Sequence, residues 1–479
     1  MDGFLGIDLG TGSAKAVVLD VEGRELGRGS AVYAVASPHP GWAEGSCEVW
    51  WAAVVSAVGA ARSAAGVEIA AIGLSGQMHG VVLVDQAGDP VRAPILWPDT
   101  RATGALYAAL PATERSALGN PFVPGMAGPI LAWLGEYEPG TLRAARWALQ
   151  PKDWLRFRLT GEAASDPSDA SATLLWDVNT DAWSDAVVAH LGVARELLPP
   201  THGSEEVAGT LTDAAASALH LSPGTPVATG AADTAASQIG TGLPALGHAQ
   251  LTIGTGGQIA IPTGNRALPH PEGRTHAFRA ATANGWYAMG AVQSAGLALE
   301  RALALTGSTW DELHAALASV PAGARGVSFI PHVAGARSPR MDPAARAGWV
   351  GIGLEHDRAD LLRAAGEGVA FTLRDALDAL LPLGLAVNRV ILAGGGTTDP
   401  AWRQLLADAL ERPLAPSPVS EASVRGAALL AAVAVDRIPS VAAAVRLAPD
   451  VDVVTHPATD LSPAYETFQR RQAALSASG

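Results

Sequence analysis

Short apolar blocks separated by turn residues open the chain. Residues 4–9 and 14–20 are mostly apolar, which predicts two strands, and residues 24–33 continue the same pattern. Asp8 is a carboxylate inside the first block. The glycine-rich segment 10–13 lies between the first two blocks, so we expect it to join strand to strand.

Apolar residues recur at helical spacing in other parts of the chain. This spacing predicts helices over residues 47–66, 185–192, 211–220, 314–320, 358–384 and 400–411. Residues 387–402 combine a strand, a run of three glycines and the start of a helix. The alternation of strands and helices predicts an α/β fold.

The sequence Gly-Thr-Gly occurs at residues 10–12 and again at 254–256, each time between two predicted strands. The copies are 244 positions apart, about half of the chain. One such turn is common in hairpins, but the pair predicts two similar domains, at residues 1–245 and 246–479, that face each other across a cleft. Backbone N–H groups of the two turns can then hold one polyphosphate from both sides.

Composition and charge narrow the class of protein. The 479 residues are 48% hydrophobic and 16% charged, which favours folded cores over disorder. A formal net charge of −14 without a basic cluster argues against a nucleic-acid partner. Cys47 is the only cysteine, which excludes an intrachain disulfide and a cysteine-based zinc site. No apolar stretch reaches the ~18 residues of a membrane span, so we expect a cytoplasmic globular protein without a membrane partner.

The residues around the first turn are candidates for phosphate chemistry. The turn lacks the last glycine and the helix of a dinucleotide fingerprint, and the chain has no Walker loop. A buried carboxylate is costly unless it is paired or lies near a metal, so we expect Asp8 to hold Mg²⁺, with a turn cap as the alternative. Thr11, Gly12 and Ser13 offer donors to a phosphate. Lys15, one of two lysines in the chain, adds a positive charge unless it is only a solvated surface residue.

Two further segments suggest ligand binding. Asp233 follows a predicted strand and opens a helical run. It is either a helix cap or a carboxylate that orients an attacking hydroxyl and accepts its proton, and an ordinary pKa of about 3.9 predicts that it is ionised at pH 7. The glycines at 394–396, followed by Asp399, let a flat ligand or a phosphate approach the backbone, or form an ordinary strand–helix turn.

Polar side chains beside an aromatic ring suggest a sugar site. Gln77 and His79 lie in a predicted loop, and Trp97, Asp99 and Arg101 lie together further along the chain. Hydroxyl partners next to a ring that packs on the carbon face are what a sugar needs. Taken singly, His79 is equally well explained as a structural histidine and Trp97 as a core residue.

These stretches, in this order, resemble the FGGY family of carbohydrate kinases in the actin/hexokinase/Hsp70 superfamily, and within it the xylulokinase branch. The resemblance runs from Gly6 to about Phe468 and is carried by residues 6–15, 38–51, 73–80, 95–101, 151–171, 230–237, 253–257, 335–356 and 394–410. It implies two ribonuclease-H-like domains that flank a cleft for ATP and Mg²⁺. It implies transfer of the γ-phosphate to a ketopentose, at O5 of D-xylulose, and a homodimer as an assembly that the chain can adopt.

The resemblance also implies roles for single residues. Asp233 falls on the position of the catalytic base, in contact with the sugar, and Asp8 on that of the metal-associated acid. The phosphate turns fall on Thr11, Gly12, Ser13, Lys15, Thr255 and Gly256. The adenosine turn falls on Gly394, Gly395 and Asp399. The sugar positions fall on Met78 and His79, with Trp97 and Asp99 beside them.

Several positions depart from the common pattern of the xylulokinase branch. Thr234 and Pro98 stand where asparagine is usual, Ala336 where glutamate is usual, and the second turn has Gly256 where serine is usual. The first two changes remove amides near the expected sugar, so a kinase for another ketose or a polyol stays an alternative. A sugar sensor without turnover is a third hypothesis, which the retained acids and turns disfavour.

Overall fold

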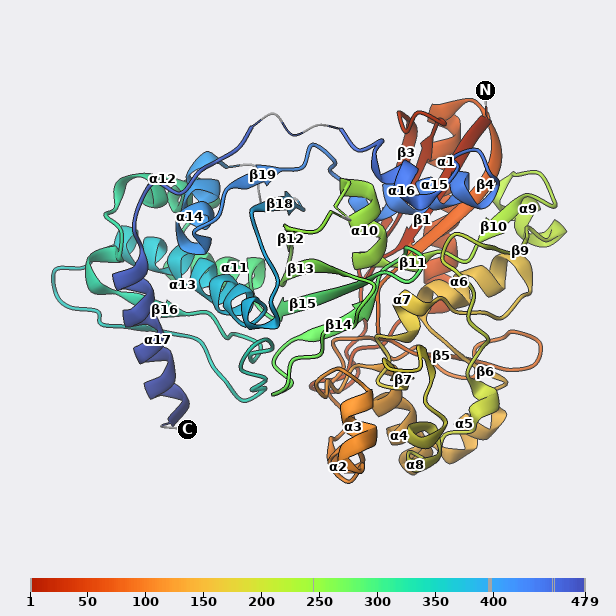
Figure 1. The fold of residues 1–479 in the computed structure, drawn as a ribbon, viewed down its shortest axis with the longest axis horizontal. Helices are drawn as coiled ribbons and strands as arrows, with labels where there is room; N and C mark the ends of the chain where they lie inside the picture. Colours follow the sequence, from red (N-terminus) through yellow and green to blue (C-terminus); the bar gives the residue numbers. More distant parts are fainter. Residues whose placement is uncertain (1, 244, 395–398, 450, 452, 478–479) are drawn as a thin grey trace.

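The computed structural model describes residues 2–243, 245–394, 399–449, 451 and 453–477 (Figure 1). Its first sheet has the strand order β3-β2-β1-β4-β10-β9, with β11 paired to β4. The strands are β1 (Asp2–Leu9), β2 (Ser13–Leu19), β3 (Glu25–Val32), β4 (Glu68–Gly76), β9 (Val207–Thr210), β10 (Pro226–Ala228) and β11 (Ala231–Ala232).

The second sheet has the order β14-β15-β13-β12-β18-β19. Its strands are β12 (His248–Ile253), β13 (Gly257–Gly264), β14 (His276–Arg279), β15 (Trp286–Val292), β18 (Arg389–Ala393) and β19 (Leu414–Pro416). In each sheet an antiparallel run, β3-β2-β1 or β15-β13-β12, is extended by two parallel strands, β4-β10 or β18-β19. The same topology therefore occurs twice, which confirms the predicted pair of similar α/β domains. Both glycine turns connect strand to strand, as expected.

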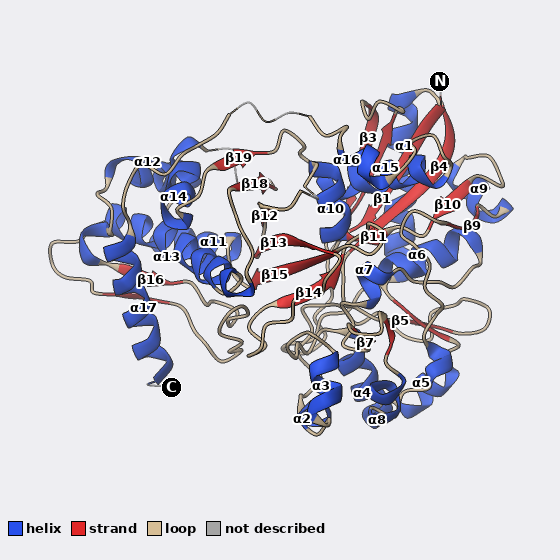
Figure 2. Ribbon diagram, in the orientation of Figure 1, coloured by secondary structure: helices blue, strands red, loops and turns tan. Residues whose placement is uncertain are grey.

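Helices cover both faces of the first sheet (Figure 2). Leu5, Ile7 and Leu9 of β1 belong to the core that Trp50 of α1 (Cys47–Ala65) also joins. The opposite face contacts α15 (Ala422–Ala434), which also packs on α10 (Asp233–Thr241). The sheet is thus a middle layer, and Asp8 lies on its face toward α15.

Two glycines of the first sheet let α15 approach closely. A Cβ atom added at Gly6 would lie 2.2 Å from the carbonyl oxygen of Val424, and one added at Gly73 would lie 1.9 Å from that of Ala427. Only glycine fits such contacts. Because α15 follows the second sheet in the chain, the C-terminal part of the sequence returns to the first sheet. The predicted domain boundary near residue 245 stays a prediction. It separates the strands of the two sheets, but it assigns α15 to the second domain although this helix packs on the first sheet.

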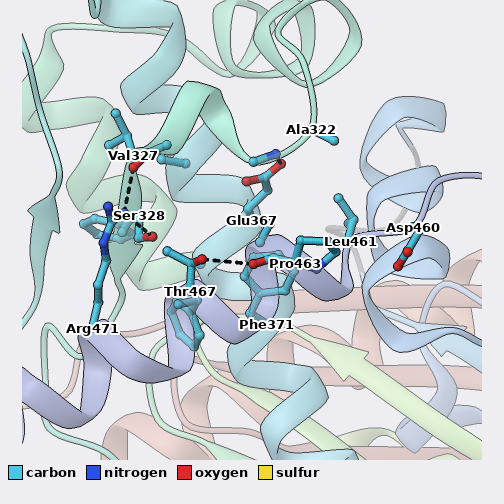
Figure 3. A pocket seen from close by; sticks show the side chains of 17 residues that line it. Ala322, Val327, Ser328, Glu367, Phe371, Asp460, Leu461, Pro463, Thr467 and Arg471 are labelled. Carbon is cyan, nitrogen blue, oxygen red and sulfur yellow. Dashed lines mark hydrogen bonds between the residues drawn. The ribbon is translucent and has the colours of Figure 1, made fainter.

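The second sheet packs on a long buried helix, α13 (Arg358–Asp378), with α11 (Gly296–Thr306), α12 (Trp310–Ser319) and α14 (Pro400–Leu410) around it. The predicted helix over 358–384 is correct but ends at Asp378, before a 3₁₀ turn that contains Pro382. The C-terminal helix α17 (Ser462–Ala477) lies over α13. Between them is a cavity of about 350 Å³, lined mainly by apolar side chains together with Glu367 and Arg471 (Figure 3).

A third group of elements lies below the first sheet in Figure 1. Its helices are α2 (Ala105–Ala108), α3 (Ala112–Ala117), α4 (Ala127–Tyr137), α5 (Pro139–Ala144) and α8 (Asp185–His190), and its strand pairs are β5 (Val82–Val84) with β6 (Trp147–Leu149) and β7 (Trp176–Asp177) with β8 (Ala182–Trp183). The remaining elements are α6 (Pro151–Thr160), α7 (Pro167–Ala170), α9 (Asp213–Leu219), α16 (Val441–Val445), and β16 (Ser328–Ile330) paired with β17 (Gly348–Val350). In the described part of the chain, no helix is long and apolar enough to cross a membrane.

Candidate active site

A cleft of about 190 Å³ receives side chains from both halves of the chain. It is lined by Thr11, Met78, His79, Trp97, Asp233, Thr234 and Ser237 from the first half, and by Thr252, Gln258, Met289, Ala291, Arg337 and Ser423 from the second. Five of the residues predicted from the sequence therefore meet in one place. The cleft holds a carboxylate, an aromatic ring and several hydrogen-bonding groups, which is the composition expected of a small-molecule site.

The first glycine turn is fixed by three neighbouring side chains. The Tyr33 hydroxyl and Gln77 Nε2 both donate to the carbonyl oxygen of Gly10, at 2.6 and 3.2 Å. Trp97 Nε1 donates to Thr11 Oγ1 at 2.8 Å. Trp97 thus lines the cleft and also holds the turn, so the core and ligand interpretations of this residue are not exclusive. Gly12 and Ser13 lie on the same turn and stay predicted phosphate donors.

Asp8 is a buried acid on β1, directly across from Lys15 on β2. Its Oδ1 atom is buried and has no hydrogen-bond partner among the described residues. Burial raises the pKa of Asp8, and the positive charge of Lys15 and the neighbouring Ser75 hydroxyl oppose that rise. An orphaned carboxylate oxygen next to a phosphate-like turn fits a divalent cation that is held by few protein carboxylates and mostly by phosphates and water. Within the described residues no group of three or more His, Cys, Asp or Glu side chains could hold a metal by itself.

Lys15 forms an ion pair with Glu421 instead of standing free. Lys15 Nζ lies 2.6 Å from Glu421 Oε2, and the two side chains are 33% and 44% exposed. This pair joins the first hairpin to the residue just before α15. The exposure leaves the lysine accessible to an anion, so its predicted phosphate contact stays a prediction.

Asp233 is the first residue of α10, at the junction with β11. Ala232 occupies the N-cap position, and Asp233 Oδ1 accepts hydrogen bonds from the Thr234 N–H at 2.5 Å and the Thr234 hydroxyl at 3.2 Å. Burial and the nearby Asp8 carboxylate raise the pKa of Asp233 to about 7, against the hydrogen bonds from Thr234. The expectation of an ordinary pKa near 3.9 is therefore wrong: close to pH 7, protonated and ionised forms coexist.

A buried charge cluster lies behind the β11–α10 junction. Ser168 Oγ accepts the Ala232 N–H at 2.9 Å and donates to Asp166 Oδ2 at 2.5 Å. Lys152 Nζ lies 3.1 Å from Asp166 Oδ1 and 3.3 Å from Asp169 Oδ2, and all of these side chains are fully buried. The cluster fixes the backbone immediately before Asp233. These residues lie in the stretch 151–171 that carries the family resemblance, but the sequence indicates no role for them, because only the fold brings them to the junction.

His79 has an unusual backbone conformation and a fixed protonation state. Its φ is +78°, which non-glycine residues rarely adopt and which is often found at functional sites. Its Nδ1 atom lies 2.8 Å from the carbonyl oxygen of Ala172, which can only accept, so Nδ1 carries the proton. Burial, together with the charge of Arg337, lowers the pKa of His79 to about 3. The ring is therefore neutral, and its Nε2 is a hydrogen-bond acceptor.

Asp99 is not among the residues that line the cleft. Its carboxylate binds the Arg101 guanidinium at 2.6 to 3.0 Å and accepts the Ala43 N–H at 2.7 Å. The Arg101 guanidinium in turn lies over the Trp42 ring, 3.5 Å from its centre. The Asp99 carboxylate is thus hydrogen-bonded to protein groups on all these sides, and its predicted sugar contact stays a prediction.

The second glycine turn separates the cleft from a larger pocket of about 390 Å³. At the base of this hairpin, Thr252 and Gln258 line the cleft, whereas Gly254 and Thr255 at its tip line the pocket. The other pocket residues are Ile253, Gly296, Leu299, Glu300, Trp310, Leu313, His314, Asp399 and Trp402. Gly256 is on the same turn but not among the lining residues.

The predicted adenosine turn lies partly at this pocket. Asp399 caps α14 by accepting the Trp402 N–H at 2.9 Å, and its Oδ2 lies 3.5 Å from His314 Nδ1. Gly394 directly follows β18 and has a φ of +91°. Gly395 lies outside the described residues.

Sequence analysis missed Arg337 in the cleft and the indoles of Trp310 and Trp402 in the pocket. Each of these residues is far along the chain from the glycine turns, and no spacing rule connects them. The available signal was that Arg337 and Trp402 lie in stretches that carry the family resemblance. Thr234 was noted as a departure from the pattern, and the structure brings it into contact with Asp233.

The sequence matches two family models, the N-terminal domain of the FGGY family of carbohydrate kinases over residues 4–240 and the C-terminal domain over residues 249–435. It is 35% identical to the xylulose kinase of Escherichia coli (strain K12) over 409 residues, which cover 85% of this chain and 84% of that protein. It is 30% identical to the xylulose kinase of Bacillus subtilis (strain 168) over 439 residues, with coverages of 89% and 87%.

Solved structures agree with this assignment. The crystal structure of a xyloylose kinase from Brucella ovis has a TM-score of 0.90 and 34% sequence identity, and covers 99% of this chain and 98% of that one. The structure of the xylulose kinase from Rhodospirillum rubrum has a TM-score of 0.88 and 27% identity, with coverages of 99% and 98%. The chain therefore belongs to the FGGY family of carbohydrate kinases.

Proposed function

We propose that the protein transfers the γ-phosphate of ATP to a ketopentose, converting D-xylulose to D-xylulose 5-phosphate. The observation that carries this proposal is Asp233, an acid with a pKa of about 7 in a cleft that both halves of the chain line. The similarity to proteins named xylulose kinase, over most of the chain, supports the choice of sugar.

The pocket beside the second turn suits the nucleotide. Its two indole rings and apolar side chains offer a flat adenine a place to pack, while Asp399 and Glu300 offer acceptors to ribose hydroxyls. Thr255 borders this pocket and Thr252 borders the cleft, so a triphosphate can follow the hairpin from one to the other. Backbone N–H groups of both turns then face its phosphates.

Met78, His79 and Trp97 form the proposed sugar wall of the cleft. A neutral His79 accepts a hydrogen bond from a sugar hydroxyl through Nε2, and the Trp97 ring packs on the carbon face. Neither contact requires a charged sugar, which agrees with a neutral ketose.

Asp233 orients the accepting hydroxyl and takes its proton. The hydroxyl oxygen forms a bond to the γ-phosphorus while the bond from that phosphorus to the β–γ bridging oxygen breaks, ADP leaves, and the proton goes to the Asp233 carboxylate. A pKa close to the working pH favours a group that must accept this proton and then release it.

Asp8 is the proposed protein ligand of Mg²⁺, directly or through water, because its Oδ1 has no other partner among the described residues. A bound Mg²⁺ would neutralise charge on the phosphates. Lys15 adds a second positive charge near the first turn. The cytoplasmic location and a homodimer stay predictions from the sequence.

One observation favours a second candidate, a kinase for another ketose or for a polyol. Thr234 lines the cleft and donates its hydroxyl to Asp233, so a position that borders the sugar differs from the common pattern. A sugar sensor without turnover is disfavoured, because Asp8, Asp233 and both glycine turns are retained.

A coupled assay of ADP release with a panel of ketopentoses, ketohexoses and polyols tests the proposal. We expect the highest kcat/KM for D-xylulose, with no ADP release when sugar is omitted. The D233N variant is the control for contaminating kinases. A higher kcat/KM for another sugar would mean that this other sugar is the substrate. Sugar binding without any ADP release would mean that the protein is a sugar sensor and not a kinase.

A further inference from the structure

Arg337 brings a positive charge into the cleft from the second half of the chain. It lies on the segment between β16 and β17 and is one of the residues that line the cleft. Its Nη2 atom lies 3.1 Å from Nε2 of His276 on β14, and because arginine only donates, His276 accepts. No other hydrogen bond of the Arg337 side chain links it to a described residue.

The Arg337 guanidinium has no acidic partner among the described residues. No described carboxylate forms an ion pair with Arg337, and its buried Nε has no hydrogen-bond acceptor among the described residues. Burial alone lowers the pKa of Arg337 to about 10, so it stays charged at pH 7. An arginine presents several N–H donors in a planar fork. Arg337 is half-buried but its Nε atom is buried, so leaving that donor unpaired is costly unless a ligand takes it up.

The surroundings of Arg337 include two neutral histidines and an aromatic ring. Its charge helps to lower the pKa of His79 and of His276, and both imidazoles are neutral. Phe278 bridges the two histidines, with ring centres 5.2 Å from His276 and 6.0 Å from His79. Arg337 therefore lies beside His276 and lines the same cleft as His79.

The backbone around Arg337 is held by residues of the second half. The Ala336 N–H donates to the Asp342 carbonyl at 2.8 Å, and the Met341 N–H donates to the Arg337 carbonyl at 2.8 Å. His332 Nε2 lies 2.7 Å from Gln472 Oε1, which ties the start of this segment to α17. These contacts fix the position from which the side chain enters the cleft.

We propose that Arg337 is a specificity-determining residue that binds the α-hydroxyketone end of the sugar, remote from the hydroxyl that Asp233 deprotonates. This inference rests on the proposed function. A ketopentose can react at O5 only when O5 is not closed onto C2, so its C2 carbonyl is then open. A carbonyl oxygen only accepts hydrogen bonds, and the unpaired donors of Arg337 complement it and the neighbouring O1.

Direct binding measured by calorimetry, with D-xylulose and with xylitol, its C2-reduced pentitol, tests the proposal. Removing a charged donor from a neutral acceptor corresponds to about a 10- to 100-fold loss in affinity. In R337M we expect the Kd for D-xylulose to rise by about that factor, the Kd for xylitol to rise less than about threefold, and the Kd for ADP to stay unchanged. A pentitol hydroxyl can turn and donate elsewhere, for example to His79 Nε2, whereas a carbonyl cannot.

R346M is the matched control, because Arg346 lies on the same segment and, among the described residues, donates only to the exposed backbone carbonyls of Pro343 and Ala345. It should bind all three ligands like the wild type. R337K keeps a charge without the planar fork, so its Kd for D-xylulose should fall between those of the wild type and R337M. If R337M fails to fold, R337K decides: wild-type affinity for both sugars would overturn the proposal.

The results separate this inference from the proposed function. Equal weakening of D-xylulose and xylitol in R337M would show a merely structural role and overturn the inference, while ADP release by the wild type would still support the kinase. If the wild type binds no ketopentose, the proposed function fails first, and the specificity role of Arg337 fails with it.

Discussion

The two glycine turns have the same Gly-Thr-Gly sequence, but they differ in length in the structure. In the first hairpin Leu9 pairs with Ala14, so the turn encloses four residues. In the second, Ile253 pairs with Gly257, so the turn encloses three. The repeated Gly-Thr-Gly sequence therefore predicts both hairpins correctly, but it does not show that their turns differ in length by one residue.

The chemistry at the base of each hairpin differs as well. In the first, the pair across the strands is Asp8 and Lys15, an acid and a base. In the second it is Thr252 and Gln258, two neutral groups. The first half thus carries both acids of the proposed reaction, whereas the second hairpin carries neutral groups and borders the proposed nucleotide pocket. The first hairpin therefore provides charged groups at its base, and the second provides neutral groups that can hold a ligand.

The largest effect is expected on the acidic side, at Asp233. In D233N an amide replaces the proton acceptor, so kcat should fall by about 10³-fold or more while the Kd for ADP stays within twofold. Coupled kinetics and calorimetry measure the two quantities. Because the raised pKa makes the ionised carboxylate unfavourable in the folded state, D233N should melt at the same or a higher temperature than the wild type above pH 7. Retention of near-normal turnover would remove Asp233 as the base.

A paired substitution at the hairpin bases tests their difference directly. D8N removes the charge proposed to hold Mg²⁺, so we expect kcat to fall about 10²-fold and the Mg²⁺ concentration for half-maximal activity to rise. T252V, at the equivalent position of the second hairpin, removes one neutral hydroxyl and should cost less than about tenfold. Steady-state kinetics across a Mg²⁺ series gives both values. Equal losses would contradict the division of roles between the hairpins.

The pH dependence of kcat/KM sharpens the link between Asp8 and Asp233. Asp233 must be ionised to accept a proton, so kcat/KM should rise with pH and level off above about 7. The Asp8 charge is one cause of the raised pKa. In D8N the rise should therefore shift to lower pH, whereas in T252V it should stay near 7. A profile that does not move in D8N would show that the two carboxylates are not coupled.

The smallest effect is expected at the ion pair between Lys15 and Glu421. At 33% and 44% exposure such a pair contributes at most about 1 kcal/mol to stability. K15M should raise the KM for ATP by about 3- to 10-fold, because it removes a charge from the phosphate turn. E421Q breaks the same pair but keeps the lysine, so its KM for ATP should stay unchanged. A similar rise in both variants would mean that the pair only holds the hairpin to α15.

The sequence was sufficient for the fold class and for the local surroundings of the turns. Strand–turn–strand patterns repeat over short windows, so the hairpins around Asp8 and Thr252 could be predicted from apolar blocks alone. The helix that begins at Asp233 was also visible, because its strand–acid–helix pattern is continuous in the chain. Local patterns decide such elements.

Long-range placement could not be predicted in the same way. Arg337 reaches the cleft, and α15 returns to the first sheet, through contacts between residues hundreds of positions apart, which no periodicity records. Asp99 looked like a sugar ligand beside Trp97, but Arg101 and the Ala43 N–H satisfy its carboxylate. The raised pKa of Asp233 depends on burial and on Asp8, and neither follows from its immediate neighbours.

A crystal structure with a non-hydrolysable ATP analogue, Mg²⁺ and D-xylulose tests the central claim most directly. We expect phosphate oxygens within hydrogen-bond distance of backbone N–H groups on both hairpins, adenine in the pocket beside Trp310 and Trp402, and O5 of the sugar beside the Asp233 carboxylate. A nucleotide that contacts one hairpin only, or a sugar whose O5 lies away from Asp233, would contradict the account.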